Sequence, residues 1–197
     1  MKPTNIKWLS RCLIASLAFV SFSSCSDDHF DINLTNASGT LWENLLATQK
    51  CDSFAMILHK TIVNKTDYGI PSTLTYDNLL KSTKVLTVWA PQDGSYNAAH
   101  WLNLLEQGDN ETVETQFVAN HIAYFNYNGS YPVVKKILLA NSKFATYDDA
   151  AATNTFNSVP ILNDPAYKNI ASTNGTLHVL DGASSFYYNL REILSVY

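Results

Sequence analysis

The chain has 197 residues, of which 46% are hydrophobic and 15% are charged. This composition excludes a disordered chain and is typical of a globular protein with a real core. Seventeen acidic residues outnumber thirteen basic ones, for a formal net charge of −4, so nucleic acid and anionic membrane surfaces are disfavoured as partners.

Residues 1–24 have the three parts of a secretory signal peptide. Lys2, Lys7 and Arg11 form a basic start, an apolar run covers residues 13–20, and small serines follow it. The run is too short for a transmembrane helix, which needs about 20 apolar residues. Removal of this segment leaves 173 residues, enough for one domain, with 10 basic and 17 acidic side chains and a net charge of −7.

The residues that follow favour a lipid anchor. Residues 22–25, Phe-Ser-Ser-Cys, resemble a bacterial lipobox, in which Cys25 becomes the lipid-modified first residue of the mature chain. Phe22 stands where leucine is usual, so cleavage at the serines by an ordinary signal peptidase is the alternative. The acidic stretch at residues 26–28 resembles the surface-export signal of lipoproteins in Gram-negative gut anaerobes, which implies an outer-membrane protein that faces the cell exterior.

The cysteines give no disulfide framework. Cys12 lies in the export segment and Cys25 would carry lipid, so Cys51 stands alone, and we expect it to be a small buried residue. The sequence has no C-x-x-C pair, which excludes a cysteine zinc site, and we expect neither a metal nor a cofactor.

Helical patterns dominate the first half of the remaining chain. Residues 25–38 are polar and aperiodic, which indicates a flexible tether before a folded domain over residues 39–197. Thr40 and Glu43 have the spacing of a capping box at the start of one helix, and Asp52 is suited to cap the next.

Further along, residues 76–80 predict a short helix at most. Residues 96–105 predict a longer one that Gly108 ends. The next helix is predicted to start near Asn110 and to bury a stripe at residues 113, 117, 118 and 122.

Strand patterns begin at residues 85–90, where both faces are apolar and Pro91 follows. After Gly129 short β-type runs follow at residues 133–134, 137–139, 144–147, 159–161 and 177–180. Residues 186–197 return to helical spacing. The sequence therefore predicts an α+β domain, with a helical first half packed on a small mixed β-sheet wedge.

Two segments resemble the conserved blocks of the fasciclin domain. Residues 86–96, LTVWAPQDGSY, resemble the first block, with Trp89 in place of the usual phenylalanine, and residues 174–181, NGTLHVLD, are similar to the second. The residues that carry the resemblance, and that it implies are structural, are Thr87, Ala90, Pro91, Asn174, Gly175, His178 and Asp181. The resemblance covers about residues 40–194. It implies a fasciclin-like fold, an extracellular domain for adhesion or matrix contact, and no catalytic chemistry, although Asn120 replaces the tyrosine of the family's Tyr-His pair and makes integrin-type adhesion doubtful.

The sequence has five histidines, each a candidate for chemistry, and two of them lie in predicted core elements. His121 follows Val113 and Phe117 at intervals of four on an apolar helix face, which favours a hydrogen-bonded core histidine over a catalytic one. His178 is expected to bridge backbone groups inside a buried strand. A hydrolase would place either ring in an open cleft beside a serine or aspartate, but the sequence has no Gly-x-Ser-x-Gly elbow and no phosphate or calcium loop, so we expect no enzyme activity.

Residues 124–131 place four aromatic side chains among amide and hydroxyl groups. Flat aromatic faces with amide donors suit sugar rings or a protein partner. The candidate partner-binding residues are His121, Tyr124, Tyr127, Asn128 and Tyr131. The alternative is a loop whose aromatic rings fold back into the core.

These patterns predict a cell-surface lipoprotein, anchored in the outer membrane through Cys25, whose fasciclin-like domain mediates adhesion or binds an extracellular protein or matrix partner. The alternative is an accessory glycan-binding component of an outer-membrane nutrient-uptake system that uses residues 124–131.

Overall fold

A computed structural model describes residues 37–64, 73–128, 134–149 and 154–186. All of them belong to one compact unit, Ile32–Tyr197. The predicted signal peptide, Cys25, most of the predicted tether, Tyr131 and all but the first residue of the predicted C-terminal helix lie outside the described residues.

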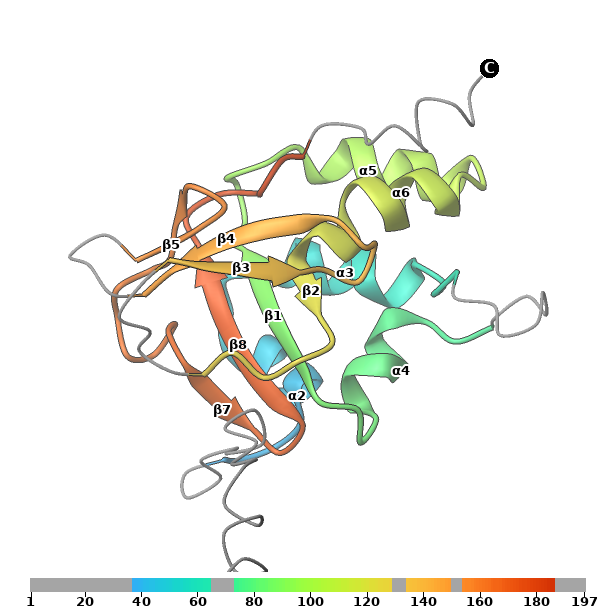
Figure 1. Ribbon diagram of the computed structural model, residues 1–197. Helices are drawn as coiled ribbons and strands as arrows, with labels where there is room; N and C mark the ends of the chain where they lie inside the picture. Colours follow the sequence, from blue (N-terminus) through green and yellow to red (C-terminus); the bar gives the residue numbers. More distant parts are fainter. Residues whose placement is uncertain (1–36, 65–72, 129–133, 150–153, 187–197) are drawn as a thin grey trace, which may run out of the picture. The chain divides into compact units, whose positions relative to one another are not determined.

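Short helices occupy the first half of this unit (Figure 1). They are α2 (Leu41–Ala47), α3 (Asp52–Lys60), α4 (Tyr76–Lys81), α5 (Ala98–Glu106) and α6 (Asn110–Gln116), followed by the 3-10 helix η3 (Val118–His121). Helix α2 begins with the predicted capping box, in which the Glu43 N–H donates to Thr40 Oγ1 (3.3 Å) and the Thr40 N–H donates to Glu43 Oε2 (2.7 Å).

Helix α6 is shorter than the sequence predicts. It ends at Gln116, because Phe117 has φ −129° and ψ −68°, outside the helical region. Ile122 begins strand β2 (Ile122–Ala123) and pairs with Val88, so its predicted place in the helix is wrong. All four residues of the predicted stripe are nevertheless buried, since pairing with a strand satisfies the same apolar pattern as continuation of the helix.

The strands form two four-stranded sheets. The first has the order β2-β1-β8-β7, with β1 (Leu86–Pro91), β7 (Ile170–Ser172) and β8 (Gly175–Leu180). The second has the order β3-β4-β5-β6, with β3 (Lys135–Leu138), β4 (Phe144–Asp148), β5 (Thr155–Phe156) and β6 (Val159–Pro160). Only β1 and β8 run parallel among the described strands, so the first sheet is mixed, and the α+β prediction is confirmed.

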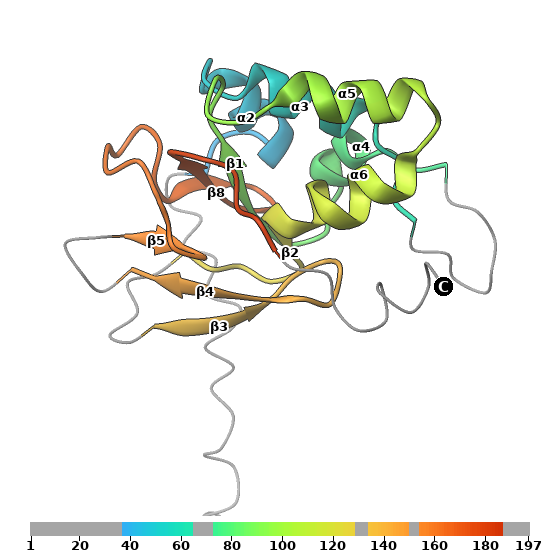
Figure 2. The same ribbon diagram turned by 90° about the horizontal axis from the view of Figure 1, so that it is seen from above.

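The elements lie in three layers. Figure 2 shows the helices on one side of the β1–β8 sheet and the β3–β4 sheet on the other. Strand β1 is buried along its whole length, as predicted, because its two faces serve different cores. Val88 packs with the helices, whereas Trp89 packs between the sheets, where its ring stacks on Phe156 at 4.3 Å.

The two blocks that resemble the fasciclin domain lie side by side in this arrangement. Residues 86–91 pair in register with residues 175–180 as the two central strands. Gly175 has φ +143°, and a Cβ at this position would lie 1.8 Å from the carbonyl oxygen of Leu86. The close approach of the two backbones therefore requires glycine here.

Asn174, directly before β8, connects three elements. Its Oδ1 accepts the N–H of Leu41 at the start of α2 (2.8 Å), and its amide NH₂ donates to the carbonyl oxygens of Leu80 (2.8 Å) and Ser82 (2.7 Å) at the end of α4. The side chain is almost fully buried, so these backbone groups depend on it for their hydrogen bonds.

We expect Asn174→Ala to lower the free energy of unfolding by about 2–4 kcal/mol, since it leaves buried backbone groups without partners. Urea denaturation followed by circular dichroism measures this change. The matched control is Asn78→Ala, which removes an exposed amide that donates to Thr75 Oγ1 (2.8 Å) and should cost less than about 0.5 kcal/mol. An Asn174 variant as stable as the control would contradict this role.

Residues at the ends of the two blocks form hydrogen bonds with each other and with the start of helix α3. The Gln92 N–H donates to the carbonyl oxygen of Leu180 (3.0 Å), and the Gln92 side-chain amide donates to the Asp181 carboxylate. The Asp93 carboxylate accepts the N–H groups of Asp52 and Ser53, both at 2.9 Å. Asp52 is thus the first residue of α3 and not its cap, and a carboxylate from the first block caps this helix instead.

Ala90 and Pro91 are buried at the end of β1, where the Ala90 carbonyl oxygen faces the Cys51 thiol at 3.9 Å. Burial raises the pKa of the Cys51 thiol to about 12. The prediction that Cys51 is a small buried residue is confirmed.

Candidate functional site

The predicted partner-binding segment is fastened to the first sheet. Thr87 Oγ1 donates to the carbonyl oxygen of Phe125 (2.6 Å) and accepts the N–H of Tyr127 (2.8 Å). Opposite Thr87 on β8, Thr176 Oγ1 donates to Asn126 Oδ1 (2.7 Å). Side chains of the two motif blocks therefore hold this segment by its backbone and by one amide.

The two described tyrosines of the segment, Tyr124 and Tyr127, face the protein more than solvent. Tyr124 and Asn128 are half-buried, and the Tyr127 ring lies 6.0 Å from that of the buried Trp89. Burial raises the pKa of both Tyr124 and Tyr127. Phe125 is the one aromatic residue of this part that is mainly exposed, at 52%. Tyr124 and Tyr127 thus follow the alternative in which the aromatic rings fold back into the core, whereas Phe125 does not.

His178, on β8, bridges backbone groups of two other segments. Its Nδ1 accepts the N–H of Asn169 (3.3 Å), and its Nε2–H donates to the carbonyl oxygen of Tyr127 (3.1 Å). This pair of partners requires a neutral ring. Burial, with a smaller effect from the Lys168 charge, lowers the pKa of His178 to about 4. The predicted bridging role is confirmed.

His121 also holds two segments together. Its Nδ1–H donates to the carbonyl oxygen of Phe117 (2.8 Å), and its Nε2 accepts the N–H of Ser184 (3.0 Å), 63 residues later. Burial lowers the pKa of His121 to about 4. The ring is 0% exposed, so the prediction that it contacts a partner is wrong, because both nitrogens serve the fold. Neither His121 nor His178 lies in an open cleft, which counts against a hydrolase.

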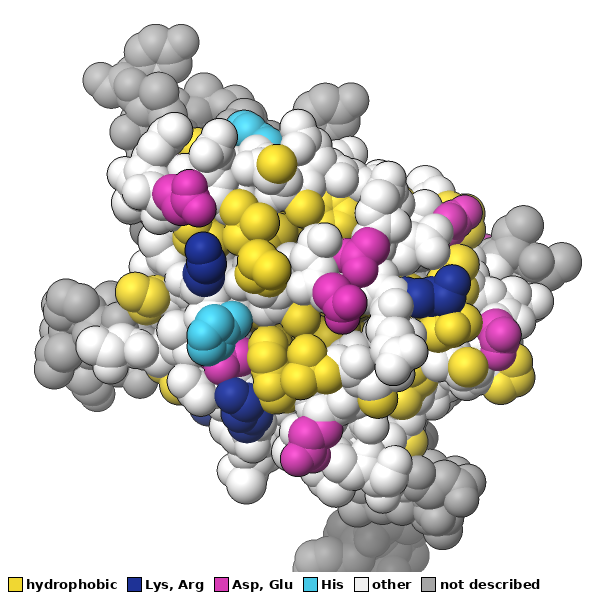
Figure 3. Space-filling view, turned by 180° about the vertical axis from the view of Figure 1, so that it is seen from behind, with side chains coloured by type: hydrophobic (Ala, Val, Ile, Leu, Met, Phe, Trp, Pro, Cys, Tyr) yellow, Lys and Arg dark blue, Asp and Glu magenta, His cyan; other side chains and the backbone are white. Residues whose placement is uncertain are grey.

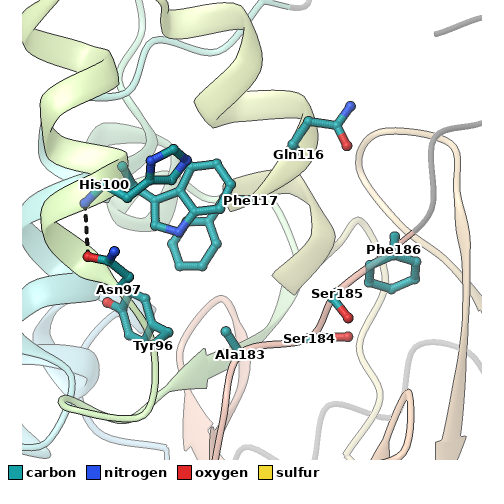
Figure 4. Close-up of a pocket in the computed structure, with 10 residues that line it drawn as sticks. Tyr96, Asn97, His100, Gln116, Phe117, Ala183, Ser184, Ser185 and Phe186 are labelled. Carbon is teal, nitrogen blue, oxygen red and sulfur yellow. Dashed lines mark hydrogen bonds between the residues drawn. The ribbon is translucent and has the colours of Figure 1, made fainter. Parts of the chain in front are cut away.

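An open pocket with a volume of about 430 Å³ lies directly beside the His121 link (Figure 4). The lining residues are Tyr96, Asn97, His100, Trp101, Gln116, Phe117, Ala183, Ser184, Ser185 and Phe186. They come from the start of α5, the end of α6 and the segment after β8. Figure 4 shows Asn97 and His100 on one side of the pocket, with Ser185 and Phe186 across from them.

Local hydrogen bonds fix the walls of this pocket. Asn97 caps α5, where its Oδ1 accepts the N–H of His100 (3.2 Å). On the opposite wall the amide of Asn157 donates to Ser184 Oγ (3.0 Å) and to the carbonyl oxygen of Ser185 (3.1 Å). His121 joins the segment after β8 to the end of α6, and Asn157 joins the same segment to the turn between β5 and β6.

The floor of the pocket is aromatic. The Trp101 and Phe117 rings stack at 4.7 Å with an interplanar angle of 16°, and the Tyr96 ring lies 5.1 Å from that of Phe117. The rim carries amide, imidazole and hydroxyl groups. An apolar floor with a few polar groups around it is the usual character of a small-molecule site.

The buried carboxylate of Asp77 has a structural role outside the pocket. It accepts hydrogen bonds from Thr75 Oγ1, Lys81 Nζ (2.9 Å) and His59 Nδ1 (3.0 Å), and so joins α4 to α3. Burial alone would raise the pKa of Asp77, but these hydrogen bonds outweigh it and hold the pKa below the usual range. In the described part of the chain, no group of three or more histidine, cysteine or acidic side chains could hold a metal ion.

The helical face shows no single large apolar surface. Figure 3, viewed from behind, shows several separate apolar patches with charged side chains between them. Leu46 and Met56, exposed at 46% and 51%, contribute to the exposed apolar side chains of α2 and α3. None of the helices in the described ranges is long and apolar enough to cross a bilayer.

Comparison with known proteins does not assign the chain to a family. No protein-family model matches it, and no curated protein matches it significantly.

Sequence reasoning missed the pocket. Its walls come from three stretches that are far apart in the chain, and only tertiary packing brings them together. The sequence shows only that α5 is rich in apolar residues, and it takes the structure to show that none of them is completely buried.

Proposed function

We propose that this protein is a cell-surface lipoprotein whose fasciclin-like domain mediates adhesion or binds an extracellular protein or matrix partner. The observation that carries the proposal is the pairing of residues 86–91 with residues 175–180 as the two central strands, because the two blocks that resemble the fasciclin domain then form one structural unit. The roles of Thr87, Asn174 and Gly175 in holding this unit together support the same reading.

The state of the two core histidines supports binding over catalysis. Each ring is fully buried and uses both nitrogens for backbone partners. A general base needs a nitrogen that can reach a substrate proton, and neither histidine has one.

Adhesion tests the proposed function directly. Cells that display the full chain should adhere to surfaces coated with collagen, fibronectin or mucin more than cells that lack it. The matched control is a Gly175→Ala chain, which we expect to be unfolded. Equal adhesion of all three kinds of cell would overturn the proposal.

The lipid anchor makes a separate prediction. Cys25→Ala should move the protein from the membrane fraction to the soluble fraction, because it removes the sulfur that would carry lipid. Cell fractionation followed by immunoblotting measures the distribution. The matched control is Cys51→Ala, which removes a buried thiol and should leave the protein in the membrane fraction. A Cys25 variant that still partitions with membranes would contradict the anchor.

The outward orientation is tested on whole cells. Proteinase K added to intact cells should cleave the domain, and lysed cells show that the enzyme is active. A domain that survives on intact cells and is cleaved after lysis faces the cell interior, which would contradict surface display.

The aromatic pocket favours a second candidate function, an accessory glycan-binding component of an outer-membrane nutrient-uptake system. Sugar rings bind to aromatic faces flanked by amide and hydroxyl groups, and Trp101 with its polar surroundings provides such a combination. Binding to an array of extracellular polysaccharides tests this function, and an array without signal would count against it.

A further inference from the structure

We infer that the pocket between α5, the end of α6 and residues 183–186 is a carbohydrate subsite that takes one neutral sugar ring. This inference gives a location and a ligand class to the second candidate function and rests on it. It replaces residues 124–131 as the sugar-binding surface, because the tyrosines described there are half-buried against the sheet.

The size of the pocket fits a small ligand. Its volume of about 430 Å³ lies at the lower end of the range of small-molecule sites, roughly 300–1,000 Å³. The pocket is partly open to solvent. An open, shallow site accepts the end or one unit of a longer chain.

The floor is held in place before a ligand arrives. Phe117 is only 2% exposed, and it supports the half-buried Trp101 through a parallel stack at 4.7 Å. His100 packs edge-on against Trp101, with ring centroids 4.8 Å apart. A ring fixed in this way loses little freedom on binding, so its contact area contributes to affinity.

The apolar side chains of α5 are only partly covered by the rest of the domain. Six of its nine residues are alanine, leucine or tryptophan, and none of the nine is fully buried. A helix in a globular domain normally buries its apolar stripe. The part of this stripe around Trp101 faces the pocket, where the apolar C–H face of a sugar ring would cover it.

The rim determines the charge and the hydrogen bonding of the ligand. No lysine, arginine, aspartate or glutamate is among the ten lining residues, so the ligand is uncharged. Asn97 accepts the His100 N–H through its oxygen, and Gln116 accepts from Lys143 Nζ (3.2 Å) through its oxygen. The NH₂ groups of both amides remain as donors for hydroxyl oxygens.

The test uses the full mature chain with glucose, galactose, mannose and N-acetylglucosamine, each also as a β-linked disaccharide. Glucuronic acid and sialic acid are included as charged sugars for comparison. Saturation-transfer NMR detects binding, and tryptophan fluorescence titration measures affinity. We expect binding of at least one of the neutral sugars. Trp101→Ala should lower that affinity by at least about tenfold, as expected for loss of about 1.4 kcal/mol of contact.

Matched variants separate the site from the rest of the surface. Trp101→Phe keeps an aromatic floor and should retain most of the affinity. Phe125→Ala and Trp42→Ala remove aromatic side chains outside the pocket and should leave affinity unchanged. Ser185→Trp fills the pocket without removing a core group, so it should abolish binding even if Trp101→Ala fails to fold.

Three results would overturn the subsite. The first is that Phe125→Ala abolishes binding and Ser185→Trp does not. The second is that the protein binds only glucuronic or sialic acid. The third is that it binds no sugar at all. The first result leaves the glycan-binding function standing with a different site. The third removes that function, whereas adhesion to protein-coated surfaces would still support the first proposed function.

Discussion

Gly175→Ala is expected to destabilise the domain by more than about 4 kcal/mol, a large part of the roughly 5–15 kcal/mol by which a typical domain is stable. The added Cβ would lie 1.8 Å from the Leu86 carbonyl oxygen and 2.8 Å from its carbon, and no side-chain movement relieves a clash with backbone. The φ of +143° adds strain for any residue with a side chain. The only relief is separation of β1 from β8, which opens the centre of the sheet.

Urea denaturation of the purified domain measures this effect, and the soluble yield of the variant reports it if the chain does not fold. Gly108→Ala is the matched control. Gly108 also has a positive φ, +84°, but nothing lies within 4 Å of its added Cβ, so its cost should be about 1 kcal/mol. Equal stability of the two variants would show that β1 and β8 do not approach as closely as described.

Mild acid is expected to destabilise the domain through its two buried histidines. Burial lowers the pKa of His121 and of His178 from 6.5 to about 4, so the folded state binds fewer protons than the unfolded chain between these values. The stabilisation is complete above pH 6.5 and is lost as the pH falls from 6.5 to 4. Each histidine contributes about 3 kcal/mol to this loss.

Urea denaturation at half-unit pH intervals measures the dependence. His121→Gln and His178→Gln should each remove roughly half of the slope, because glutamine does not titrate. His100→Gln, at an exposed histidine, should leave the slope unchanged. Two other groups with shifted pKa values do not account for it. The pKa of Asp77 is lowered, so the stability that its carboxylate contributes is lost only below the usual carboxyl range. The pKa of Glu114 is raised, so its protonation stabilises the folded domain as the pH falls. A flat profile between pH 4 and 6.5 would contradict the neutral state of both rings.

Local signals in the sequence predicted much of the secondary structure. The Thr40–Glu43 capping box and the alternation before Pro91 each depend on residues within a few positions, and both features are present. The burial of Cys51 and the bridging role of His178 also followed from their immediate surroundings.

Features that depend on distant residues escaped prediction. The cap of α3 comes from Asp93, 41 positions after Asp52, and no pattern around Asp52 reveals it. Strands β5 and β7 have two and three residues, too few for a period to be recognised, and they form because β4 and β8 offer pairing edges.

The orientation of the aromatic segment, residues 124–131, also depends on distant residues. Four aromatic rings within eight residues resemble an exposed surface in the sequence, but hydrogen bonds from Thr87 and Thr176 determine which way the described part of the segment turns. His121 is the hydrogen-bonded core histidine that its apolar helix face predicted, and it holds two walls of the pocket, but it is not the partner-binding residue that was also expected.

The parallel pairing of β1 and β8 also governs when the domain can form. Leu86 meets Gly175, 89 positions later, and the loop between them must close before the centre of the first sheet exists. Contacts of such high sequence separation make folding slow, since the entropy of loop closure is lost before the contacts compensate for it. A nascent chain therefore cannot complete this core until residue 180 has been synthesised.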